Sequence, residues 1–136
     1  MPEVKHVGVV LVSHSAAVAE SVAALCKALA GGGAEAVPVR PAGGTPDGGF
    51  GTDADLIAAA ARDADQGAGV VLLADLGSAV LTVKALVEDE ELPEQARLVD
   101  APFVEGAVAA VVTSSTGADL AAVEGAASEA YDYRKV

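Results

Sequence analysis

The sequence predicts a three-layer α/β/α sandwich with a mostly parallel central sheet. Short apolar runs alternate along the 136 residues with segments whose apolar residues recur at helical spacing. The runs are continuously apolar, which is typical of strands that are buried on both faces. Alternation of such strands with helices requires right-handed crossovers that place helices on both sides of a parallel sheet.

Composition limits the size, the partners and the location that we expect. The length suits one domain spanning residues 1–136. The formal net charge of −12 repels phosphate backbones, so we expect no nucleic-acid partner. No apolar run approaches the roughly 18 residues that span a bilayer, and no leader pattern opens the chain, so we expect a cytoplasmic protein without a membrane partner. The single cysteine, Cys26, offers no disulfide or zinc spacing, and we expect no metal and no cofactor.

The first strand and the first helix have clear patterns. Val7 to Val12 form a β-branched run that is too short for a helix. The next segment predicts a helix, because four apolar residues recur at spacings of four, three and four and therefore share one face. Ser15 is a suitable N-cap, and the glycines at 31–33 end the helix. The four apolar residues are Val18, Val22, Leu25 and Leu29.

A weaker strand and a long loop follow. Residues 36–40 (AVPVR) predict a second strand, and Pro38 places it at an edge because proline lacks the donor that a central strand needs. Residues 41–51 form a Gly/Pro loop that is long for a compact domain. Thr52 and Asp55 match a capping box for a helix that runs to about Asp65.

The second half of the chain repeats the alternation. It predicts a third strand over 70–74, a helix over about 78–88 and a fourth strand over 97–99. A further helix is supported by valines at 104, 108, 111 and 112, and a last helix spans 119–130.

Reactive residue types gather where the predicted strands end. In a parallel sheet, ligands bind beyond the carboxyl ends of the strands. The segments at those ends contain most of the reactive residue types in the chain, namely Ser13-His14-Ser15, the Gly/Pro loop, Asp75-Leu76-Gly77-Ser78 and Asp100-Ala101-Pro102.

His14 is the first candidate for chemistry. It lies between a buried strand and the start of a helix, where the backbone N–H groups of Ser15, Ala16 and Ala17 have no partner within the helix and can receive an anion. An anion held beside a histidine indicates phosphoryl chemistry. The alternative is a histidine that only caps or packs at the strand end.

Asp75 strengthens that interpretation. A carboxylate at the end of the adjacent strand can accept the proton of one imidazole nitrogen and leave the other nitrogen free as a nucleophile. Gly77 permits close backbone approach, and Ser78 either caps the next helix or donates to a phosphoryl oxygen. The alternative for Asp75 is an ordinary turn aspartate.

Four segments together carry a family resemblance: VGVVLVSHSAAVAESV, GTDAD, VVLLADLGSAV and DAPFVEGAVAA. From about Val7 to Glu124 the chain resembles the phosphotransferase subunits of bacterial phosphoenolpyruvate-dependent dihydroxyacetone kinases, which have the fold of mannose-class enzyme IIA domains. The resemblance implies that His14 accepts a phosphoryl group from the phosphocarrier HPr and that Asp75 is its partner. It further implies transfer to ADP held in a nucleotide-binding subunit, a separate subunit that binds dihydroxyacetone, and a homodimer.

In such a site we expect positioning and charge stabilisation to carry most of the catalysis. The candidate phosphate-binding residues belong to the two helix starts and to the long loop. They are Ser13, Ser15, Ala16, Gly51, Thr52, Gly77 and Ser78.

Other functions stay open from the sequence. The same fold serves as an enzyme IIA component in sugar uptake, and it can persist as a noncatalytic regulatory or dimer-forming module. A hydrolase could use His14 and Asp75 with Ser13 or Ser15 as the nucleophile, although no GxSxG elbow is present. We expect His6 to be a solvated end residue and Cys26 to be a buried, inert thiol.

Overall fold

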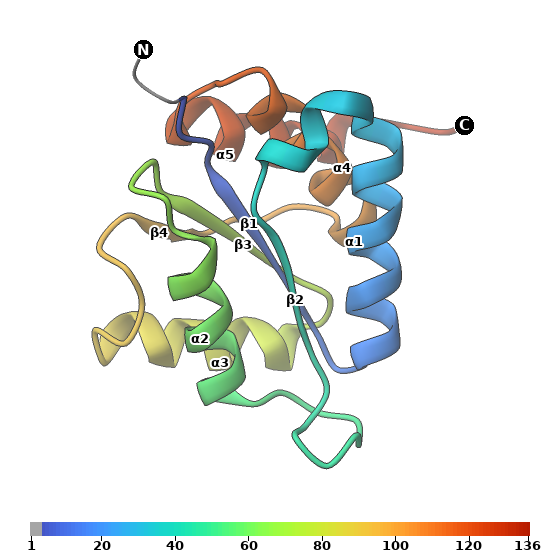
Figure 1. Ribbon diagram of the computed structural model, residues 1–136. Coiled ribbons are helices and arrows are strands. Elements are labelled where there is room, and N and C mark those ends of the chain that lie inside the picture. The colour runs from blue at the N-terminus through green and yellow to red at the C-terminus, as the bar shows by residue number, and fades with distance from the viewer. Residues whose placement is uncertain (1–3) are drawn as a thin grey trace.

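The computed structural model describes residues 4–136. It contains one four-stranded, wholly parallel sheet with strand order β2-β1-β3-β4. Helices cover both faces of this sheet (Figure 1), so the predicted α/β class is confirmed. The strands are β1 (Gly8–Ser13), β2 (Val39–Gly43), β3 (Val70–Ala74) and β4 (Ala96–Leu98). The helices are α1 (Ala16–Ala30), α2 (Ala54–Ala64), α3 (Gly77–Glu88), α4 (Phe103–Ser115) and α5 (Leu120–Glu129), with the 3-10 helices η1 (Gly31–Ala36) and η2 (Ala130–Asp132).

Alternate residues of the central strands supply two separate cores. Val9 and Leu11 of β1 pack in the cluster that contains α1, α4 and α5 residues, whereas Val10 and Val12 pack in the cluster that contains α2 and α3 residues. All four side chains are fully buried. Successive side chains of a strand point to opposite faces, so a run that is apolar throughout is the pattern that a two-sided core requires.

The second strand lies three residues later than predicted. The predicted glycine stop is confirmed, since α1 ends at Ala30 with Gly31 as its C-cap. The glycines then open the 3-10 helix η1 over residues 31–36, and β2 therefore begins at Val39. The predicted edge position is confirmed, since β2 pairs only with β1 in the sheet. By contrast, the third strand occupies residues 70–74 as predicted.

The helix caps confirm one prediction and correct two. The Ser15 side chain caps α1 by accepting from the Val18 N–H. The cap of α2 is Asp53, not Thr52: its carboxylate accepts from the Leu56 N–H at 2.9 Å. Ser78 lies inside α3, and Leu76 occupies its N-cap position without a side-chain bond. Thr52 and Ser78 are therefore free for other contacts.

The apolar stripe predicted on α1 is mostly exposed. Val22 is buried, but Val18, Leu25 and Leu29 are 44%, 42% and 60% exposed, because the helix contacts the sheet through its small residues and Cys26. By length and composition alone, the 21-residue helical stretch Ala16–Ala36, formed by α1 and η1, meets the minimum for a membrane span, with a mean hydropathy of 1.2 over an 18-residue window. One side of this stretch packs in the core.

Candidate active site

The site lies at the point in the sheet where the order of the strands reverses, between β1 and β3. β1 is flanked by β2 and β3, and the register pairs Val12 with Ala74, so the residues that follow β1 and β3 emerge side by side. The next helices then cover opposite faces, α1 one and α3 the other (Figure 1). This is the crevice at which open α/β sheets bind ligands. It brings His14 and Asp75 together, as predicted.

The imidazole of His14 is held between a carboxylate and a hydroxyl. Its Nδ1 lies 2.9 Å from Oδ1 of Asp75, and its Nε2 lies 2.5 Å from Oγ of Ser78. An ionised carboxylate only accepts hydrogen bonds, so Nδ1 carries the proton and the Nε2 lone pair receives the Ser78 hydroxyl. The His14 and Asp75 side chains are 24% and 18% exposed, which leaves the ring accessible. Nε2 is therefore the unprotonated nitrogen of the ring, which is the form that a histidine nucleophile requires.

The second oxygen of Asp75 is fixed as firmly as the first. Oδ2 accepts from the Ser13 hydroxyl at 2.8 Å and from the His14 backbone N–H at 3.1 Å. Burial raises the pKa of the Asp75 carboxyl, but the hydrogen bonds from the His14 ring, the His14 backbone and Ser13, together with the nearby imidazole, lower that pKa below its ordinary value of 3.8. Asp75 is therefore an ionised, oriented acceptor near neutral pH.

The Gly/Pro loop closes around the histidine. The Gly51 N–H donates to the His14 carbonyl at 2.9 Å, and the Thr52 and Thr82 hydroxyls lie 2.9 Å apart. Thr82 also donates to the Ser78 carbonyl at 3.2 Å, so Thr52 donates to Thr82. Hydrogen bonds thus connect the Gly/Pro loop, helix α3 and His14 to one another.

Thr82 is a residue of this site that was not predicted from the sequence. It lies four residues after Ser78, and residues at that spacing share one face of a helix. This spacing was the available signal.

Some of the other predicted residues are exposed to solvent, and others form hydrogen bonds within the protein. Ala16 and Gly77 are exposed at the first turns of α1 and α3. Ser13 is fully buried, and its hydroxyl donates to Asp75 instead of facing solvent. Ser13 and Ser15 do not contact Nε2, and the serine that contacts this nitrogen is Ser78.

Two predictions concern residues outside this site. His6 is not a solvated end residue: it is half-buried, and its Nδ1 lies 2.8 Å from the Ser114 carbonyl. Cys26 is fully buried, as predicted, and burial raises the pKa of its thiol to about 11. Among residues 4–136, no three His, Cys, Asp or Glu side chains gather in a way that could hold a metal ion.

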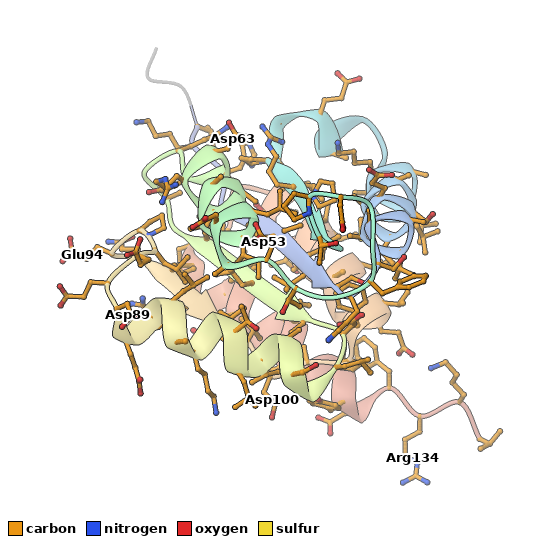
Figure 2. All side chains as sticks on the ribbon, turned by 90° about the horizontal axis from the view of Figure 1, so that it is seen from below. Asp53, Asp63, Asp89, Glu94, Asp100 and Arg134 are labelled. Atoms are coloured by element: carbon orange, nitrogen blue, oxygen red, sulfur yellow. The ribbon has the colours of Figure 1, made fainter. Side chains whose placement is uncertain are left out.

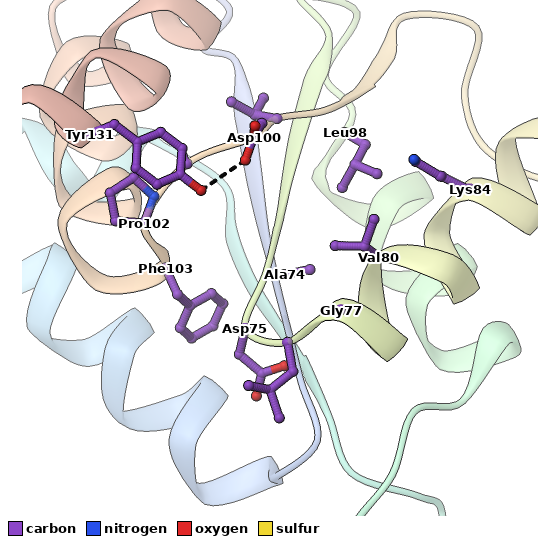
Figure 3. Close-up of a pocket in the computed structure, with 13 residues that line it drawn as sticks. Ala74, Asp75, Gly77, Val80, Lys84, Leu98, Asp100, Pro102, Phe103 and Tyr131 are labelled. Atoms are coloured by element: carbon purple, nitrogen blue, oxygen red, sulfur yellow. Dashed lines mark hydrogen bonds between the residues drawn. The ribbon is translucent and has the colours of Figure 1, made fainter.

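A pocket of about 560 Å³ adjoins the site (Figure 3). It extends from Asp75 and Gly77 to Phe103 and Tyr131, and the Tyr131 hydroxyl donates to Asp100 at 2.8 Å. Apolar side chains, including Leu76 and Val80, form part of its wall. The pocket provides a partly apolar surface directly beside the histidine pair.

The sequence and the fold both match known proteins. The EIIA-man family, described as PTS system fructose IIA component, matches residues 8–124. The phosphoryl donor subunit DhaM of PEP-dependent dihydroxyacetone kinase 2 from Listeria innocua is 36% identical over 110 residues, which cover 79% of this chain and 86% of that protein. The subunit of the same name from Escherichia coli is 31% identical over 116 residues, or 84% of this chain and 25% of that protein.

A solved structure has the same fold. The crystal structure of the unknown function protein EF1359 superposes with a TM-score of 0.80 at 31% identity, covering 91% of this chain and 94% of that one. The chain spans about a quarter of the length of the Escherichia coli relative, but most of the Listeria relative. The family match covers all four strands and the segments that carry His14 and Asp75. The chain therefore belongs to the EIIA-man family.

Proposed function

We propose that this chain is the phosphoryl donor subunit of a phosphoenolpyruvate-dependent dihydroxyacetone kinase and that it carries the phosphoryl group on Nε2 of His14. The observation that carries the proposal is the oriented pair of His14 and Asp75, in which Nδ1 is bound to a carboxylate at 2.9 Å and Nε2 lies against the hydroxyl of the exposed Ser78. The names of relatives at 28–37% identity supply the kinase system.

The transfer needs little acid–base work. The Nε2 lone pair attacks the phosphorus of the donor phosphohistidine, the donor N–P bond breaks, and its electron pair returns to the donor imidazole. The ring of His14 becomes positively charged as the new N–P bond forms, and the adjacent Asp75 carboxylate stabilises this charge. Such a reaction depends chiefly on alignment and electrostatics.

The surrounding groups accommodate the phosphoryl oxygens. Ser78 must rotate away from Nε2 when phosphorus arrives, after which its hydroxyl can donate to a phosphoryl oxygen. Ala16 and Gly77, in the first turns of α1 and α3, supply backbone N–H groups. The Ser15 N–H, which was also expected to receive an anion, instead donates to the Ser13 hydroxyl at 3.1 Å. No atom lies within 4 Å of a Cβ built at Gly77, so this glycine leaves open space beside the nucleophile. Gly51 and Thr52 fix the end of the Gly/Pro loop near the histidine, because they bond to the His14 carbonyl and to the Thr82 hydroxyl.

The proposed partners fit the charge of this face. Asp53 and Asp100 lie on the side of the molecule that Figure 2 shows, which is the carboxyl edge of the sheet. A net charge of −12 favours encounter with proteins that present basic faces. We propose that HPr phosphorylates His14 in the cytoplasm and that the ADP-holding subunit then takes the group, for use by the subunit that binds dihydroxyacetone.

A homodimer is part of the proposal. Val18, Leu25 and Leu29 of α1 and Val104 and Val112 of α4 are exposed on two helices that cover the same face of the sheet. An apolar surface of this kind is suited to a second copy. Light scattering at micromolar concentration should give a dimer mass and Leu25→Asp a monomer mass. A monomeric parent chain would contradict this part.

The decisive experiment locates the phosphoryl group. Incubation with phosphoenolpyruvate, enzyme I and HPr should give an acid-labile, base-stable label on the chain. His14→Ala should abolish the label and His6→Ala should retain it, with circular dichroism confirming that both variants are folded. A label on His6, or no label on the parent chain, would reject the assignment.

A second candidate is an enzyme IIA component of sugar uptake, favoured by the description of the family as a fructose IIA component. Both candidates use the same phosphohistidine and differ in the acceptor. The labelled chain should therefore be mixed with the ADP-holding and dihydroxyacetone-binding subunits. Formation of dihydroxyacetone phosphate supports the kinase, whereas a label that moves only to a sugar permease component supports uptake. A noncatalytic module would not be labelled at all.

A further inference from the structure

Three side chains at the site have the order and spacing of an acyl-transfer triad. Ser78 Oγ lies 2.5 Å from Nε2 of His14, and Nδ1 of the same ring lies 2.9 Å from Oδ1 of Asp75. A serine hydroxyl, an imidazole and a carboxylate in this sequence of contacts make the serine a nucleophile, because the ring can take its proton and the carboxylate holds the ring in the required tautomer.

The carboxylate is oriented for this role. Oδ2 of Asp75 accepts from the buried Ser13 hydroxyl and from the backbone N–H of His14 itself. These two bonds direct Oδ1 at Nδ1 and keep the proton on that nitrogen. The Nε2 lone pair then faces the Ser78 hydroxyl.

Ser78 is also accessible and well placed. It is exposed on the first turn of α3, directly after the short turn that follows the buried strand β3. The N–H groups at a helix start are available to stabilise a developing oxyanion. Ser78 follows Gly77, which lines the pocket of about 560 Å³, and the Leu76, Val80 and Phe103 side chains of that pocket are suited to an apolar acyl group (Figure 3).

We propose that the Ser78–His14–Asp75 triad gives this protein a second activity, the hydrolysis of small carboxylic esters through an acyl-Ser78 intermediate. Ser78 Oγ forms a bond to the carbonyl carbon while its proton passes to Nε2. The ester C–O bond then breaks, and Nε2 returns the proton to the departing alkoxide. Water, deprotonated by Nε2, attacks the acyl group, and the proton is given to Oγ as the acid leaves.

This activity does not depend on the proposed phosphoryl transfer, but the two compete for one nitrogen. A phosphoryl group on Nε2 occupies the lone pair that must accept the Ser78 proton. Phosphorylation of His14 should therefore switch ester hydrolysis off. Direct transfer from phosphorylated His14 to Ser78 is not part of the proposal, since Oγ approaches Nε2 itself and cannot attack phosphorus opposite the N–P bond.

The test uses p-nitrophenyl acetate as substrate and a fluorophosphonate probe for the nucleophile. The parent chain should release p-nitrophenol catalytically, and mass spectrometry should find the probe on Ser78. Ser78→Ala should lose at least about tenfold in turnover and all labelling, and Asp75→Asn should also lose turnover. Ser115→Ala is the matched control, because its hydroxyl bonds to the Val112 carbonyl and lies outside the site.

The outcomes separate this inference from the proposed function. Turnover by Ser78→Ala equal to that of the parent chain, probe on another residue, or parent turnover no greater than that of His14→Ala would overturn the triad. Normal phosphorylation of His14 with no ester hydrolysis would reject only the triad. Ester hydrolysis without phosphorylation of His14 would reject only the phosphoryl transfer.

Discussion

Replacing Ser13 by alanine should loosen Asp75 without touching the histidine ring. Ser13 is fully buried, and its Oγ donates to Oδ2 of Asp75 at 2.8 Å while accepting from the Ser15 N–H at 3.1 Å. The substitution removes both bonds and leaves Oδ2 only the His14 backbone N–H. We expect the pKa of Asp75 to rise towards its ordinary value, because one of the hydrogen bonds that lower it is lost.

The structure provides a matched comparison for the magnitude. Ser13 and Ser114 are the two buried polar residues in the described part of the chain, and the Ser114 hydroxyl donates to the neutral Val7 carbonyl at 2.7 Å. A hydrogen bond to a charged group contributes about 1.5–3 kcal/mol and a neutral one about 0.5–1.5 kcal/mol. We therefore expect Ser13→Ala to lose about 2 kcal/mol of unfolding free energy and Ser114→Ala about 1 kcal/mol.

The rate of His14 phosphorylation should differ more between Ser13→Ala and Ser114→Ala than their unfolding free energies do. A loosened carboxylate holds the His14 tautomer less firmly, so Ser13→Ala should slow single-turnover phosphorylation by roughly tenfold, and Ser114→Ala should not. Urea unfolding measures the stability, and ¹⁵N NMR of the imidazole measures the tautomer. The reasoning is refuted if both variants lose the same activity, or if Ser13→Ala keeps the parent tautomer and rate.

Three further predictions concern stability and reactivity. Gly106→Ala should lower the free energy of unfolding in urea by about 1–3 kcal/mol, because the new Cβ would lie 2.7 Å from Ala101 Cβ. Gly125→Ala meets no atom within 4 Å and should raise this free energy by up to about 1 kcal/mol. Equal effects of the two substitutions would contradict the packing. Cys26 should resist thiol reagents near about pH 8 until the chain unfolds, because burial raises its pKa to about 11; rapid native labelling would contradict this. Asp75 has a lowered pKa in the folded protein, so its ionised form stabilises the fold above pH 3.8, its ordinary pKa, and this contribution disappears as the pH falls through the folded-state pKa. Asp75→Asn should therefore reduce the dependence of the unfolding free energy on pH over this acid range. An unchanged dependence would contradict this prediction.

Local patterns in the sequence were sufficient for the candidate pair and for most elements, but not for the 3-10 helix η1 or the bounds of β2. The continuous apolar run before His14 predicted a strand buried on both faces, and the structure places β1 in the middle of the sheet. Because strand ends in a parallel sheet meet at one edge, the order of segments alone predicted that His14 and Asp75 would meet. Their 2.9 Å contact shows that the pattern contained this information.

What the sequence could not decide depends on contacts between distant segments. Thr52 matched a helix cap, but its hydroxyl bonds to Thr82, and Ser78 also matched a cap but contacts Nε2 of His14. The stripe on α1 had helical spacing, yet spacing does not say which flank faces the sheet, and Leu29 is 60% exposed.

Short-range propensities therefore determined which segments are strands and helices and which chemical groups lie at their ends. Only the tertiary structure decided which hydroxyl bonds to which partner, because a hydrogen bond requires atoms to lie within about 3 Å in a defined direction. Residues 14 and 78 are 64 positions apart in the chain, and their contact exists only once β1 and β3 are paired.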